Sequence, residues 1–172
     1  EDHPTDPDAK ALRIVQGRAK PAPKWWKRTK LERDNWTAQA ARDGLLDFLK
    51  ELWAEGYPWT AMATSWAAGA GHMEIVQWLR AQGCSWSEAT CSDAAKGGHL
   101  HILQWCRAQT PPCPWSEKTC NYAAEEGHFE IMQWARARGC RLNERTCEAA
   151  ARGGVLEAVQ WARAEGCAWD ER

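Results

Sequence analysis

Cysteine and histidine are the residues of this 172-residue chain with the most obvious site chemistry. Cys84 and Cys91 lie seven positions apart, and His99 and His101 follow them, so these four side chains are a candidate zinc site. Zinc sites usually contain a closely spaced pair such as Cys-x-x-Cys, however, and none of the eight cysteines has this spacing. A redox-active thiol is also not favoured, because no Cys-x-x-Cys pair and no neighbouring base marks one of the cysteines. We therefore expect no metal and no cofactor, and a metal- or redox-linked cysteine protein is kept as an alternative.

A hydrolase would need a nucleophile, a general base and an orienting group that meet at one place in the fold. The chain contains Cys, His and Glu, but these residues recur at equivalent positions of a repeated pattern. A catalytic site is usually unique within a chain. We therefore expect no enzyme activity, no catalytic residues and no small-molecule substrate.

The repeated pattern begins with a glycine and is clearest from Gly71 to Trp86, which reads GHMEIVQWLRAQGCSW. It returns, with changes, from Gly98, Gly127 and Gly154, and a weaker copy begins at Gly44. The steps between these glycines are 27, 27, 29 and 27 residues. Self-similarity at a short, nearly fixed period predicts a solenoid of stacked repeats.

Cysteine and tryptophan follow the same period. Seven of the eight cysteines occupy two repeat positions, and eight of the 13 tryptophans occupy two others. A position shared by the repeats is usually a packing position, where Cys acts as a small apolar residue. We therefore expect reduced thiols and an intracellular protein in a reducing compartment, either the cytosol or an organelle interior. The chain does not begin with Met, and removal of a presequence would place it in a chloroplast or a mitochondrion.

Each repeat predicts two short helices joined by glycine turns. The Ala-rich segment 90–98 suits a first helix, because Gly98 costs little in the left-handed conformation that ends one. A second helix is predicted at Leu100–Ala108, and Glu74, Gln77 and Arg80 form the polar stripe of the second helix before it. Helices of ~8–10 residues are unstable alone in water, so the repeats must stack. The sequence therefore predicts an all-α solenoid of five short helix-turn-helix repeats.

The repeat resembles the ankyrin repeat over residues 36–171. Residues 94–100, AAKGGHL, resemble the family's AAxxGHL. Residues 74–79, EIVQWL, resemble its EIVxLL, with Trp78 at a Leu position. The resemblance implies a non-enzymatic module for protein–protein interaction.

The chain also departs from the ankyrin pattern. The family period is about 33 residues, so about six residues are missing before each first helix. The family has a β-hairpin finger there, which we expect to be clipped to a tight turn anchored by tryptophan. The TPLH tetrapeptide of the family is absent as well. In these features the chain is similar to the short Trp- and Cys-rich repeats of algal and giant-virus ankyrin-like proteins, and the resemblance leaves the first-helix face as the implied binding surface.

Polar positions of the predicted first helices differ from one repeat to the next. Solenoids read their partners with one set of side chains per repeat, so these positions are candidate partner contacts. Tyr122 is the best single anchor among them, because aromatic residues dominate binding energy at interfaces. A solvated face whose residues vary freely is the alternative. The candidates are Ser92, Asp93, Lys96, Asn121, Tyr122, Glu125, Glu126, Glu148 and Arg152.

Residues 1–35 form an N-terminal arm outside the repeats. Its first part is acidic, and residues 20–33 carry six basic side chains, two prolines and two adjacent tryptophans without any helical or strand period. Such a segment lacks a core of its own, and we expect it to become ordered on another molecule, with docking against the solenoid as the alternative. The candidate contacts are Lys24, Trp25, Trp26, Lys27 and Arg28. Nucleic-acid binding by these residues is an alternative that the net charge of −1 does not favour.

The sequence thus predicts an arm, 1–35, and a solenoid, 36–172, with repeats near 36–60, 61–88, 89–117, 118–144 and 145–172. No segment has the ~20 consecutive apolar residues of a membrane-spanning helix. The preferred function is an accessory or scaffold subunit that is docked into a larger multi-subunit protein complex through the arm and the first-helix face. A free adaptor that binds a soluble protein is the alternative.

Overall fold

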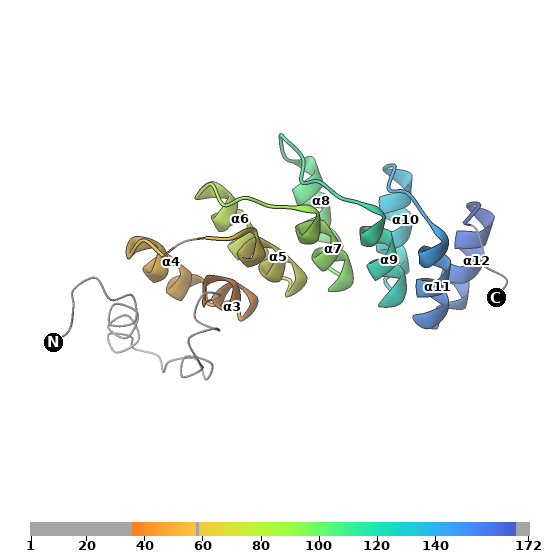
Figure 1. The fold of residues 1–172 in the computed structure, drawn as a ribbon, viewed down its shortest axis with the longest axis horizontal. Coiled ribbons are helices and arrows are strands. Elements are labelled where there is room, and N and C mark those ends of the chain that lie inside the picture. Colours follow the sequence, from red (N-terminus) through yellow and green to blue (C-terminus); the bar gives the residue numbers. More distant parts are fainter. Residues whose placement is uncertain (1–35, 58, 168–172) are drawn as a thin grey trace.

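The computed structural model describes residues 36–57 and 59–167. This part of the chain contains ten helices and no strand. The helices follow one another as pairs in an elongated array, with the first helices α3, α5, α7, α9 and α11 in sequence along it (Figure 1). The bounds are α3 Trp36–Arg42, α4 Leu46–Ala54, α5 Ala61–Gly69, α6 Met73–Ala81, α7 Glu88–Lys96, α8 Leu100–Ala108, α9 Glu117–Glu125, α10 Phe129–Ala137, α11 Glu144–Arg152 and α12 Leu156–Ala164. The predicted all-α solenoid is confirmed.

The first helices pack closely because small residues line their contacts. Ala94 and Ala95 of α7 are fully buried, and alanines hold the same positions in the other first helices. Gly98 follows α7 with a φ of +78°, a conformation that L-residues with a side chain rarely adopt. A Cβ at Gly98 would also lie 2.7 Å from the imidazole of His128, so glycine lets the next repeat approach.

The second helices supply the larger apolar side chains. Ile102, Leu103 and Cys106 of α8 are fully buried, whereas Gln104 on the same helix is exposed. This division is the amphipathic pattern that the sequence predicts, and α8 has the predicted bounds. One apolar cluster contains buried residues from Ala38 to Ala162, so the core runs continuously through the stacked pairs.

The turns between repeats bury cysteine and partly bury tryptophan. The thiol of Cys113 donates a hydrogen bond to the carbonyl oxygen of Ser87 over 3.5 Å, and the thiol of Cys140 donates to that of Ser116 over 3.3 Å. All eight cysteines are free thiols. Burial raises the pKa of Cys84, which keeps this thiol protonated at neutral pH. These cysteines act as small packing residues that link one repeat to the next.

Candidate protein-binding surface

The exposed side of the first helices carries residues that differ between repeats. We call this side of α5, α7, α9 and α11 the first-helix face. Trp66, Asp93 and Tyr122 occupy the same repeat position on three consecutive helices, 27 and 29 residues apart. All three are partly exposed, so the face presents an acid between two aromatic residues.

A hollow of about 610 Å³ opens on this face beside Trp66 and Asp93. Gly69, one of its lining residues, stands where the following repeats carry Lys96 and Glu125, and it brings no side chain into the hollow. Burial raises the pKa of Asp93 above its usual range, and the charge of Lys96 opposes this shift. The hollow is lined by Arg42, Ser65, Trp66, Gly69, Ala70, Asp93, Lys96, Gly97 and Glu126.

Charged residues on the face are paired across neighbouring helices. Lys96 Nζ lies 4.0 Å from a carboxylate oxygen of Glu126 and 5.6 Å from the ring centroid of Tyr122. The guanidinium of Arg152 donates to Glu125 over 2.8 Å. Exposed pairs of this kind contribute only ~0–1 kcal/mol to stability. These weak pairs add little to stability, and they place both signs of charge on the face.

Most of the contacts predicted on the first helices are at least partly exposed, whereas Ser92 is buried and Asn121 is hydrogen-bonded to the next first helix. Ser92 is only 4% exposed, and its hydroxyl donates to the carbonyl of Ala89 over 3.2 Å. Asn121 is partly buried and accepts a hydrogen bond from the hydroxyl of Thr146 over 2.6 Å. Glu148 is exposed on α11. The predicted contacts at 24–28 lie outside the described residues.

Trp66 and Arg42 line the hollow but are not among the contacts predicted from the sequence. Trp66 does not occupy either of the tryptophan positions that recur through the repeats. It aligns instead with Asp93 and Tyr122, which are both predicted contacts. The alignment of repeats is the signal that could have found it, because the equivalent positions of the next two repeats carry predicted contacts.

Among the described residues, no group of three or more His, Cys, Asp and Glu side chains could hold a metal ion. Nor is any helix in the described ranges both long enough and apolar enough to cross a membrane. The first-helix face itself carries aromatic rings, paired charges and a hollow, which suit recognition of another molecule.

The comparisons with known proteins agree with the architecture. No protein-family model matches the sequence, and no curated protein matches it. Among solved structures, the crystal structure of the human ASB11 ankyrin repeat domain is similar, with a TM-score of 0.57 over 77% of this chain and 70% of that chain. The two sequences are 16% identical, so the likeness concerns the fold. The chain is an ankyrin-like helical solenoid.

Proposed function

We propose that the chain is a non-enzymatic protein-binding module whose first-helix face captures a partner protein. The observation that carries this proposal is the row Trp66, Asp93 and Tyr122 beside a hollow of about 610 Å³. Aromatic side chains that are partly exposed next to a recess are typical anchors of protein interfaces. Their position on consecutive helices suits an extended segment that crosses several repeats.

The charges around the hollow favour a protein over a nucleic acid. Arg42 and Lys96 are balanced there by Asp93 and Glu126. Nucleic acid binds to surfaces with an excess of basic residues, because its phosphates dominate the affinity. A protein segment with both signs of charge fits this surface better.

Within this function, we favour a subunit that is held in a larger assembly by two contacts, the arm and the first-helix face. The composition of residues 20–33 supports this version, since two adjacent tryptophans and six basic side chains suit docking on an acidic protein surface. Deletion of residues 1–35 tests it. Partner binding that survives the deletion unchanged would favour the free adaptor.

The similarity of the repeats to the short Trp- and Cys-rich repeats of algal and giant-virus ankyrin-like proteins also stays a prediction.

The test of the first-helix face compares matched variants in pull-downs from an extract of the source cells, read by quantitative mass spectrometry. Trp66→Ala and Tyr122→Ala should each lose the same proteins that the wild-type chain retains. Gln104→Ala, on the exposed side of α8, is the control and should lose none. With the purified partner, each aromatic variant should bind at least ~30-fold more weakly, which corresponds to an interface anchor. Binding that is unaffected by both aromatic variants would refute the proposal.

A further inference from the structure

Two repeats show how an indole is held at the turn after the second helix. The guanidinium carbon of Arg80 lies 3.9 Å from the ring centroid of Trp86, and that of Arg107 lies 4.2 Å from the ring centroid of Trp115. Each indole also meets the edge of a tryptophan in the next repeat. The centroid distances are 6.2 Å for Trp86 with Trp105 and 5.9 Å for Trp115 with Trp134. The turn therefore has a place for one aromatic ring, covered by an arginine.

The next repeat has the arginine without the ring. Leu142 stands at the position of Trp86 and Trp115, and Arg136 stands at the position of Arg80 and Arg107. Arg136 Nε instead donates to Glu165 of the following repeat over 3.1 Å. The exchange of an indole for the smaller Leu side chain thus coincides with a change in the partner of the arginine.

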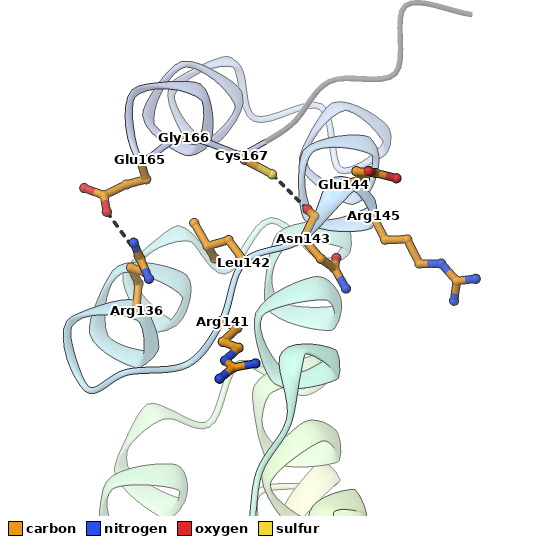
Figure 2. Close-up of a pocket in the computed structure, with 9 residues that line it drawn as sticks. All are labelled: Arg136, Arg141, Leu142, Asn143, Glu144, Arg145, Glu165, Gly166 and Cys167. Carbon is orange, nitrogen blue, oxygen red and sulfur yellow. Dashed lines mark hydrogen bonds and ion pairs between the residues drawn. The ribbon is translucent and has the colours of Figure 1, made fainter.

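A hollow of about 640 Å³ opens at this turn. Figure 2 shows Leu142 between the Arg136–Glu165 pair on one side and Asn143 with Cys167 on the other. The thiol of Cys167 donates a hydrogen bond to the carbonyl oxygen of Asn143 over 2.8 Å, which holds these two residues together. The lining residues are Arg136, Arg141, Leu142, Asn143, Glu144, Arg145, Glu165, Gly166 and Cys167.

We propose that this hollow receives an aromatic side chain of a partner protein, in the place that Trp86 and Trp115 fill in their own repeats. Arg136 would then cover the incoming ring as Arg80 and Arg107 cover theirs. Three arginines and two glutamates line the hollow, so an acidic residue next to the aromatic one is favoured. The proposal rests on the chain being a protein-binding module, but it concerns a surface separate from the first-helix face.

The experiment uses N-acetyl-tryptophan, which carries an indole and a carboxylate, as the probe. It is titrated into the ¹⁵N-labelled full chain, and binding is read from amide shifts in two-dimensional NMR spectra. The amides of Leu142, Asn143 and Gly166 should shift together. N-acetyl-tryptophanamide, which lacks the carboxylate, should bind more weakly, and N-acetyl-leucine, which lacks the ring, should not shift these amides.

Variants then test the geometry. Leu142→Trp places the chain's own indole in the hollow and should weaken N-acetyl-tryptophan at least ~10-fold. Arg136→Gln removes the covering cation and should weaken it about three-fold, as expected for an exposed cation–π contact. Arg107→Gln is the matched control and should leave the affinity unchanged, because Trp115 already fills that place.

The opposite change should create a site. Trp115→Leu removes the indole from the preceding turn, and the probe should then also shift amides around position 115. Far-UV circular dichroism checks that each variant keeps its helices. If Trp115→Leu does not fold, the comparison of the wild type with Leu142→Trp and Arg136→Gln decides whether the hollow binds the probe.

Three outcomes would overturn the proposal. One is undiminished binding to Leu142→Trp, and another is equal binding of N-acetyl-leucine. The third is binding that occurs only in a Trp169→Ala variant, because the chain's own indole would then be the occupant. Trp66→Ala should not alter the titration. If the titration showed no site at Leu142 while Trp66→Ala still lost the partner protein in the pull-down, the function proposed for the first-helix face would stand.

Discussion

The interior of the solenoid and its first-helix face use the repeat in opposite ways. In the interior, one position holds Ala94, Ala123 and Ala150 in turn, and all three are buried. On the face, one position changes from Trp66 to Asp93. Residues that recur are constrained by stacking against equivalent neighbours, whereas residues that vary are released from that constraint. Residues that recur in every repeat therefore indicate the fold, and exposed residues that differ between repeats indicate candidate binding positions.

The largest expected effect comes from breaking the interior. Leu103 is 0% exposed in α8, and Leu103→Ala should lower the free energy of unfolding by ~2–5 kcal/mol because it leaves a cavity. The adjacent Gln104→Ala, on the exposed side of the same helix, should change it by less than ~0.5 kcal/mol. Urea unfolding followed by circular dichroism measures both. Equal effects would contradict the division of this helix into two sides.

The second expected effect separates two equivalent buried threonines. Thr146 forms a capping box at α11, accepting from the backbone N–H of Asn143 over 3.0 Å, and its hydroxyl donates to Asn121 over 2.6 Å. Thr146→Val should therefore cost ~1–2 kcal/mol. The hydroxyl of Thr119 is buried at the same repeat position without a hydrogen-bond partner. Thr119→Val should be neutral or stabilising, and a similar loss in both would show that the hydroxyl bonds do not matter.

The sequence predicts some parts of this structure well and others not at all. The period, the glycine turns and the bounds of α8 follow from the sequence, because contacts between neighbouring repeats force the same residues to recur. The burial of Ser92 does not follow, since a small polar residue fits either side of a helix. The hollow at Leu142 depends on Arg136 and Glu165, which are 29 residues apart, and on the volume that an absent ring leaves between them.

A smaller effect compares the two arginine environments. Arg80 covers Trp86 and donates to the carbonyl of Cys84 over 2.7 Å, so Arg80→Gln should cost ~1 kcal/mol. Arg136 forms an ion pair with Glu165 in which both side chains are 38% exposed, and Arg136→Gln should cost less than ~0.5 kcal/mol. Thermal unfolding of both variants in low and high salt measures this. Only the Arg136 variant should lose its difference from the wild type as salt screens the pair.

The smallest expected effect concerns pH and the histidine that recurs just before the second helix. The imidazole of His99 lies against Gly71 of the preceding repeat, where a Cβ would approach it to 2.6 Å. Burial, and then the charges of His101, His128 and His72, lower the pKa of His99 below 6.5, while a hydrogen bond with the backbone of Gly69 opposes the shift. The unfolded chain then binds more protons than the folded one below pH 6.5. Neutral His99 therefore contributes stability that is present above this pH and is lost as the pH falls through the folded pKa.

His99→Gln should remove that contribution at about pH 7.5 and flatten the fall in melting temperature between about pH 7.5 and 5.5. The effect should be small because His99 is partly exposed, so solvent screens its charge. Val155 replaces histidine at the equivalent position beside Gly127. Its Cγ2 would lie 3.3 Å from a Cβ at that glycine, and valine has no titratable group. Val155→His should therefore steepen the pH dependence that His99→Gln flattens. If both variants kept the wild-type slope, the contact between repeats would be insensitive to the charge of the imidazole.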